Sequence, residues 1–196
     1  MPTPRPDTVR LQGIVKGFWE SAALMSAVEL GLFTAVSRGH DTIGQAAEAI
    51  GIESVNAERL MTALTAMKLL DRAGDTFRNA PDVERFLVED SASYAGPWML
   101  FSKPRWSGWG ELTERLREPV DAQRVLGMYD EGFDVARARE YHEATYSIGM
   151  GAARRFHRQV DLSGRSRMMD LGGGSGCYCI VGAERHPTLS AVVLDL

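Results

Sequence analysis

The stretch Arg167-Met168-Met169-Asp170-Leu171-Gly172-Gly173-Gly174-Ser175-Gly176 decides the fold of this chain. An apolar run leads into an acid, and the acid leads into closely spaced glycines. Residues 177–185 continue with the pattern of a helix, which Pro187 ends. The following run, 189–195, is typical of a second buried strand and closes on Asp195. The sequence therefore predicts a strand–loop–helix–strand unit of the α/β class.

The residue types in this loop have separate physical reasons. Glycine permits a turn with positive φ and leaves no Cβ in the way of a ligand. The helix start offers free backbone N–H groups and the positive end of a dipole. Asp195 ends the second strand 23 residues after Gly172, where such folds hydrogen-bond the hydroxyls of a ribose. These features predict a nucleotide-like ligand.

The spacing of the glycines narrows the ligand. A dinucleotide loop has glycines at its first, third and sixth positions. Counted from Gly172, this chain has them at the third and fifth positions, and Cys177 is the sixth. The pattern Asp-x-Gly-x-Gly-x-Gly resembles motif I of the class I S-adenosylmethionine-dependent methyltransferases, whose ligand has a ribose and an adenine but no pyrophosphate. The alternative is an ordinary glycine-rich turn without a ligand.

Composition excludes several classes of protein. The 196 residues are 44% hydrophobic and 24% charged, which is typical of a globular protein. The net charge of −4 argues against a general nucleic-acid or anionic-membrane binder. Cys177 and Cys179 are too few for a disulfide framework or a four-ligand zinc site and indicate a reducing compartment. Without a signal peptide or a long apolar run, we predict a cytoplasmic protein with no membrane partner and no metal.

The strand–loop–helix–strand unit leads to a further expectation about length. An open parallel sheet needs several more strands, covered by helices on both faces. Two strands and one helix do not provide that cover. We therefore expect the N-terminal part of a longer protein, truncated just after the second strand of its sheet.

A flexible tail is predicted at 1–7, and a helical domain is predicted at 8–90. Apolar residues recur at helical spacing from the start of this domain, and 24–36 is apolar nearly all round, as in a buried helix. Gly13 and Gly17 lie one turn apart and either admit a second backbone or only weaken the helix. The apolar face consists of Leu11, Ile14, Val15, Phe18, Trp19 and Ala22.

A helix-turn-helix and a hairpin complete this domain. Thr42 and Gln45 form a capping-box signal for a short helix that a glycine ends. A second helix, with Ser54 or Asn56 as its cap, leads to a hairpin with a turn at Gly74-Asp75. This order resembles a winged helix and raises the hypothesis of a DNA-binding regulator.

Charge decides between the two roles of such a module. Residues 51–80 contain four basic and four acidic side chains, which gives no net attraction for phosphate. The second helix also lacks a cluster of Arg, Asn and Gln that could read base edges. A structural or dimerising module without a nucleic-acid partner is therefore favoured.

Residues 91–160 are predicted to be a helical connecting region that contributes to a substrate pocket. A long helix is expected from Asp134 to about Val160. None of the four histidines has a metal-ligand or nucleophile–base pattern, although His142 and His157 precede the glycine loop. The aromatic residues that could line a pocket for a flat substrate, or fill a core, are Tyr94, Trp98, Phe101, Trp106 and Trp109.

Together these motifs resemble one family. Residues 27–33, the helix-turn-helix with its hairpin, Asp170–Gly176 and 193–196 occur in the order found in small-molecule O-methyltransferases of the plant caffeate type and their bacterial secondary-metabolism relatives. The resemblance covers nearly the whole chain. It implies an α+α/β fold, in which a winged-helix-like domain at 8–90 forms an intertwined homodimer. The start of a Rossmann-like methyltransferase domain, at 161–196, follows.

The same resemblance implies residue roles. S-adenosylmethionine would lie along the glycine loop, with Asp170 supporting the loop and Asp195 holding the ribose hydroxyls. The helix with Tyr146 and Met150 would lie near the methyl donor. The implied cofactor-binding residues are Asp170, Gly172, Gly173, Gly174, Gly176 and Asp195.

The implied reaction is methyl transfer to a hydroxyl of a small, aromatic natural product. In the family, the general base is a histidine beyond the position of Leu196, so the catalytic residue stays unknown and this chain alone is not expected to turn over. The alternatives are C- or N-methylation, a non-methylating relative of the same fold, and the DNA-binding regulator.

Overall fold

The computed structural model describes residues 7–119 and 135–195. The chain forms two compact units, Met1–Gly96 and Pro97–Leu196, and each is considered by itself. Residues 1–6, which make up most of the predicted tail, and residues 120–134, just before the last long helix, lie outside the described residues. The predicted division into a tail and three further regions stays a prediction.

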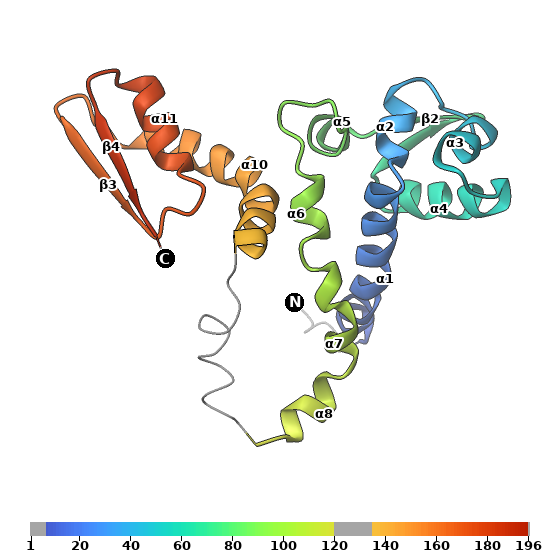
Figure 1. The fold of residues 1–196 in the computed structure, drawn as a ribbon. Helices are drawn as coiled ribbons and strands as arrows, with labels where there is room; N and C mark the ends of the chain where they lie inside the picture. The colour runs from blue at the N-terminus through green and yellow to red at the C-terminus, as the bar shows by residue number, and fades with distance from the viewer. Residues whose placement is uncertain (1–6, 120–134, 196) are drawn as a thin grey trace, which may run out of the picture. The chain divides into compact units, whose positions relative to one another are not determined.

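The first unit begins with a long helix, α1 (Val9–Glu29), and a short one, α2 (Leu32–Ser37) (Figure 1). The break between them is Gly31, whose φ of +70° only glycine adopts without strain. The sequence analysis described 24–36 as one buried run, and the structure divides this run, because α1 continues to Glu29 and Gly31 separates it from α2. The apolar residues of α2 are buried, as predicted for this run.

The helix-turn-helix consists of α3 (Ile43–Ile50) and α4 (Ser54–Ala66). The predicted capping box is present, since the N–H of Gln45 donates to Oγ1 of Thr42 and the Gln45 side chain accepts from the N–H of Thr42. The prediction for the next cap is wrong. Glu53 is the N-cap of α4, and its side chain makes no capping bond.

The predicted hairpin is confirmed as β1 (Leu70–Ala73) and β2 (Thr76–Asn79), which pair antiparallel. A short helix, α5 (Pro81–Phe86), follows, with Pro81 at its start. The centre of this unit is apolar, and its largest fully buried side chains are Leu32, Phe33, Met61, Leu64, Leu70, Phe77 and Val83.

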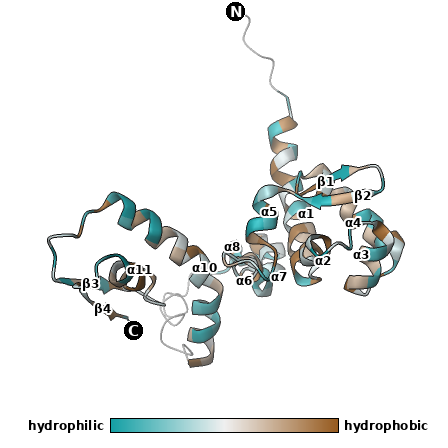
Figure 2. Ribbon diagram, turned by 90° about the horizontal axis from the view of Figure 1, so that it is seen from above, coloured by the Kyte–Doolittle hydropathy of each residue, from teal (hydrophilic) through white to brown (hydrophobic). Residues whose placement is uncertain are grey.

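The second unit opens with short helical turns and continues with one long helix. The turns are α6 (Gly96–Leu100), η1 (Lys103–Arg105), α7 (Trp106–Gly110) and α8 (Leu112–Arg117). The long helix is α10 (Val135–Gln159), close to the predicted bounds. Teal and brown stretches alternate along α10 in Figure 2, as expected for a helix with one apolar face.

The predicted strand–loop–helix–strand unit is confirmed. Strand β3 (Arg167–Leu171) pairs in parallel with β4 (Ser190–Leu194), and α11 (Cys177–Arg185) connects them (Figure 1). Helix α11 packs against both strands on one side and against α10 on the other. The helix pair forms a small core with the buried side chains of Met150, Ala153, Cys177 and Val181.

The opposite face of this parallel pair is uncovered. Its apolar side chains are between 47% and 71% exposed, and they are Met169, Leu171, Val192 and Leu194. Parallel sheets in stable domains are covered on both faces. Further structure is therefore expected to pack on this face.

Within residues 7–119 and 135–195, no helix has both the length and the apolar character needed to cross a bilayer.

Candidate cofactor-binding site

The glycine loop between β3 and α11 has a backbone that other residues rarely adopt. Gly172, Gly174 and Gly176 have φ values of +68°, +52° and +73°. The N–H of Gly172 donates to the Leu194 carbonyl oxygen at 2.7 Å, which ties the loop to the end of β4. Three glycines of the motif thus have a conformational reason for being glycine.

At position 173 a glycine is needed because there is no space for a side chain, and not because of its backbone conformation. A Cβ at this position would lie 2.7 Å from Oδ2 of Asp170 and 3.0 Å from Cγ1 of Val193. The Asp170 carboxylate therefore lies against the loop. Its Oδ2 is buried and has no hydrogen-bond partner among the described residues. An unsatisfied buried oxygen is unfavourable and marks a place where a partner is missing.

Asp195 lies at the other side of the same loop. The backbone N–H of Gly174 donates to its Oδ2 at 2.5 Å. A hydrogen bond to a carboxylate is stronger than one between neutral groups. The two acids and four glycines named from the sequence are thereby brought together at the carboxyl ends of β3 and β4, where ligands bind in open α/β sheets.

Helix α10 adds a side chain whose role the sequence did not reveal. A Cβ at Gly174 would lie 3.4 Å from Cε1 and 3.6 Å from Nδ1 of His142, and 4.0 Å from Oδ2 of Asp195. His142 Nδ1 is buried and has no hydrogen-bond partner among the described residues. From the sequence, only the position of this histidine upstream of the loop was evident, because its approach to Gly174 depends on how α10 packs.

Aromatic side chains form a row that ends at His142. The rings of Trp98 and Phe101 stack with centroids 5.8 Å apart, and Phe101 meets the edge of Tyr141 at 5.7 Å. Tyr141 in turn meets His142 at 5.8 Å. The Arg105 guanidinium lies 5.2 Å from the Phe101 ring centre. Trp98 and Tyr141 are exposed, so this row is a surface feature and not a filled core.

Two other residues of α10 have different roles. Met150, expected near the methyl donor, is buried in the core between α10 and α11. Tyr146 is exposed, and its carbonyl oxygen accepts from the Cys177 thiol at 3.7 Å. Met150 is therefore a packing residue.

The cysteines are buried free thiols. Burial raises the pKa of Cys179, and the nearby charge of Asp170 raises this pKa further. Its thiol donates to the Val192 carbonyl oxygen at 3.5 Å. Neither cysteine joins a metal-binding group, since no cluster of three or more metal-ligating side chains occurs in the part of the chain that the structure describes.

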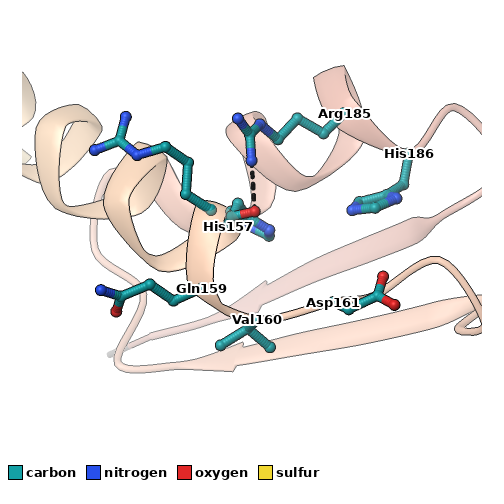
Figure 3. Close-up of a pocket in the computed structure, with 7 residues that line it drawn as sticks. His157, Gln159, Val160, Asp161, Arg185 and His186 are labelled. Atoms are coloured by element: carbon teal, nitrogen blue, oxygen red, sulfur yellow. Dashed lines mark hydrogen bonds between the residues drawn. The ribbon is translucent and has the colours of Figure 1, made fainter.

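A hollow of about 450 Å³ lies where α10 and α11 end (Figure 3). Nε2 of His157 donates to the Tyr178 carbonyl oxygen at 2.8 Å, and Nη1 of Arg185 donates to the His157 carbonyl oxygen at 2.5 Å. Hydrogen bonds from the backbone N–H and from the side chain of Ser163, together with the charge of His186, lower the pKa of Asp161. The residues that line this hollow are His157, Arg158, Gln159, Val160, Asp161, Arg185 and His186.

This hollow lies on the wrong edge of the sheet for the ligand. Val160 and Asp161 precede β3, and His186 precedes β4, so the hollow lies at the amino ends of the strands. Ligands of such sheets bind at the carboxyl ends. Its hydrogen bonds hold two helix ends together, and the glycine loop remains the candidate site.

Comparisons with known proteins agree with the fold. Residues 13–89 match the O-methyltransferase dimerisation domain. The chain is 32% identical to 3-hydroxy-5-methyl-1-naphthoate 3-O-methyltransferase of Streptomyces sahachiroi, over 95% of this chain and 54% of that protein. It is 30% identical to an N,N-dimethyltransferase of Streptomyces rimosus, over 93% of this chain and 55% of that protein. Human N-acetylserotonin methyltransferase, solved with its cofactor, superposes with a TM-score of 0.77 at 22% identity, over 98% of this chain and 60% of that one.

These matches indicate the class of protein to which the fold is similar. The fold is a helical dimerisation domain followed by a methyltransferase-like βαβ unit. Residues 13–89 are therefore similar to the O-methyltransferase dimerisation domain, and the proteins that the chain resembles include bacterial secondary-metabolism O-methyltransferases and acetylserotonin O-methyltransferases. It spans about half the length of the curated relatives that it matches.

Proposed function

We propose that this protein is an S-adenosylmethionine-dependent methyltransferase that acts on a hydroxyl of a small aromatic molecule. The observation that carries the proposal is the glycine loop, with three glycines in the left-handed region and Asp195 bonded to the loop from the end of β4. The similarity to O-methyltransferases over nearly the whole chain supports the same reaction.

The described residues fit this cofactor. The glycine loop leaves room for a ligand, and two buried polar atoms near it, Oδ2 of Asp170 and Nδ1 of His142, lack partners. Asp195 would bind the ribose hydroxyls, Asp170 would support the loop, and the nucleoside would lie along Gly172, Gly173, Gly174 and Gly176. When bound, the cofactor supplies a methyl group on a sulfonium, which an oxygen nucleophile attacks in line.

The aromatic row supports a flat acceptor. Trp98, Phe101 and Tyr141 offer partly exposed rings in a row that ends at His142, which lies near Gly174, and aromatic rings bind flat apolar molecules by stacking. The name of the Streptomyces sahachiroi relative gives a hydroxylated naphthoate as its acceptor. A hydroxylated aromatic acid is therefore the first acceptor to test, and amines are included because another relative is an N,N-dimethyltransferase.

The other part of the proposal is a homodimer through residues 8–90, with α3, α4 and the β1–β2 hairpin as a winged-helix-like module. The apolar face of α1 is exposed along Leu11, Ile14 and Val15, and the match to a dimerisation domain covers this helix from residue 13. We assign no general base among the described residues, and we expect no nucleic-acid partner.

The test is calorimetric titration of the purified protein with S-adenosylmethionine. Asp195→Ala is expected to weaken binding about 30- to 100-fold, because a pair of charge-assisted hydrogen bonds is lost. Asp161→Ala, at the opposite edge of the sheet, is the matched control and should bind as the wild type does. Absence of binding by the wild-type protein would refute the proposed function, whereas unchanged affinity in Asp195→Ala would remove only that residue from the site.

A further inference from the structure

His142 and Asp195 reach the same point of the glycine loop from different elements. His142 comes from α10, and Asp195 comes from the end of β4. The position that a Cβ of Gly174 would occupy lies 3.6 Å from Nδ1 of the histidine and 4.0 Å from Oδ2 of the acid. Because residue 174 is glycine, no side chain of its own fills this position. A ligand that lies over Gly174 would therefore meet both polar atoms.

The Nδ1 atom of His142 lacks a partner that its surroundings should provide. It is buried and unpaired within the described chain, although a buried polar atom in a folded protein nearly always has a hydrogen-bond partner. The His142 ring makes a T-shaped contact with the Tyr141 ring, with centroids 5.8 Å apart, and its Cε1 lies 3.4 Å from the point where a Cβ of residue 174 would be. An oriented ring with an unsatisfied nitrogen is what a ligand-binding histidine requires.

We propose that His142 is a second ribose-binding residue, which acts beside Asp195 on the nucleoside of the cofactor. This inference rests on the proposed function. A carboxylate only accepts hydrogen bonds, whereas a neutral imidazole nitrogen donates or accepts according to its tautomer. A ribose has two adjacent hydroxyls, each of which donates and accepts. One hydroxyl can donate to Asp195 while the other pairs with Nδ1 of His142.

Packing alone is the competing explanation, and one pair of variants separates the two. His142→Phe keeps a flat ring against Tyr141 but removes both nitrogens. His142→Asn gives up the ring but places an amide close to the position of Nδ1. A packing role predicts that Phe is tolerated better than Asn, and a hydrogen-bonding role predicts the reverse. His186→Phe, in the hollow at the other edge of the sheet, is the matched control.

The experiment is calorimetric titration of the wild type and these variants with S-adenosylhomocysteine and with 5′-methylthioadenosine, which lacks the amino-acid part. We expect His142→Phe to weaken both ligands by the same factor, about 5- to 30-fold, the effect of one lost hydrogen bond at a buried site. His142→Asn should retain affinity within about threefold, and His186→Phe should not change it. Thermal unfolding without ligand establishes that each variant is folded. If His142→Phe does not fold, His142→Leu and the 2′- and 3′-deoxy analogues decide, since the wild type and His142→Asn should lose affinity for at least one analogue and His142→Leu, which makes no hydrogen bond, should lose less.

Three outcomes would overturn the assignment. Wild-type affinity in folded His142→Phe would leave the histidine without a ligand. A loss seen with S-adenosylhomocysteine but not with 5′-methylthioadenosine would move the contact to the amino-acid part. Stronger binding by Phe than by Asn would make the role one of packing. If the wild-type protein binds neither ligand, the proposed function fails, which is a separate result from failure of the His142 assignment.

Discussion

Single glycines in this chain differ in what they need. Gly172, Gly174 and Gly176 have positive φ values, so any side chain would strain the backbone. Gly173 does not have a positive φ, but the Asp170 carboxylate occupies the space that a Cβ at this position would need. Gly151, in α10, has neither constraint, since a Cβ there would meet no atom within 4 Å. The sequence shows glycine at all these positions, and only the structure shows which glycines are needed for their backbone conformation, which for lack of space, and which for neither.

Gly173→Ala is expected to lower the free energy of unfolding by about 1–3 kcal/mol, the usual cost of overpacking. The added methyl group would overlap the Asp170 carboxylate and crowd Val193. Gly151→Ala is the control and should raise the free energy of unfolding by about 0.5–1 kcal/mol, because alanine favours a helix. Urea denaturation measures both values. Equal stability of the two variants would contradict close packing of the Asp170 carboxylate against Gly173.

The cysteines give a second prediction at this scale. Burial and the charge of Asp170 raise the pKa of Cys179, so at neutral pH the thiolate, which is the reactive form, is rare. Cys177 is buried beside Gly149. We expect neither thiol to react with an aromatic disulfide reagent in the native protein, and both to react at once in denaturant. Because the raised pKa favours the neutral thiol, the native rate at Cys179 should increase as the pH rises. A fast native reaction at neutral pH would show that this thiol is accessible.

At the scale of elements, α11 depends on a close approach of α10. A Cβ at Gly182 would lie 3.1 Å from Cε1 of His157 and 3.3 Å from Cδ2 of Leu189. Both neighbours are themselves buried, and His157 is held by its bond to the Tyr178 carbonyl oxygen. Neither side chain can move aside easily, so the glycine permits the two helices to pack at this distance.

Gly182→Ala therefore sets two effects against each other. Alanine in a helix interior is favoured over glycine by about 1 kcal/mol, whereas crowding of buried side chains costs about 1–3 kcal/mol. We expect crowding to win and the Tm to fall. The Gly151→Ala variant again provides the contrast, because there only the helix preference acts. If thermal unfolding shows a higher Tm for Gly182→Ala, the packing at His157 is looser than described.

Local signals predicted most elements, and their limits are physical. The Thr42–Gln45 capping box, the Gly74 turn and the helix at Cys177–Arg185 depend on neighbours in the chain, and each is confirmed. The missed cap at Glu53 arises where several neighbouring residues have similar local preferences.

The candidate site was predictable only in part. Asp170 and the glycines lie on one continuous motif, and the second acid follows from the length of a βα unit. The approach of His142 to Gly174 and the alignment of Trp98 with Tyr141 come from helix packing across distant parts of the sequence. A histidine is as common on a helix surface as in a site, so no local pattern could have selected it.

At the scale of the whole molecule, an unusual amount of apolar surface is exposed. One such surface is the face of the β3–β4 pair away from α11, and the other is the first part of α1. Contiguous exposed apolar surface marks places of association. On α1 the exposed side chains recur at helical spacing and so form a single stripe. They are Leu11, Ile14, Val15, Phe18 and Trp19.

The stripe on α1 carries the last prediction, which concerns the proposed homodimer. Ile14 is 66% exposed and lies in the middle of the stripe, so in a dimer it would be covered by the second copy. Ile14→Asp would place an unpaired carboxylate in that contact, and burial of an unpaired charge is strongly unfavourable. We expect the dissociation constant to rise at least about tenfold, as for a residue at the centre of an interface. Lys16→Asp introduces the same carboxylate on the same helix away from the stripe and should leave the dimer intact. Sedimentation velocity at micromolar concentration measures all three proteins. A monomeric wild-type protein would refute the dimer, and equal dimerisation of the two variants would place the interface elsewhere in residues 8–90.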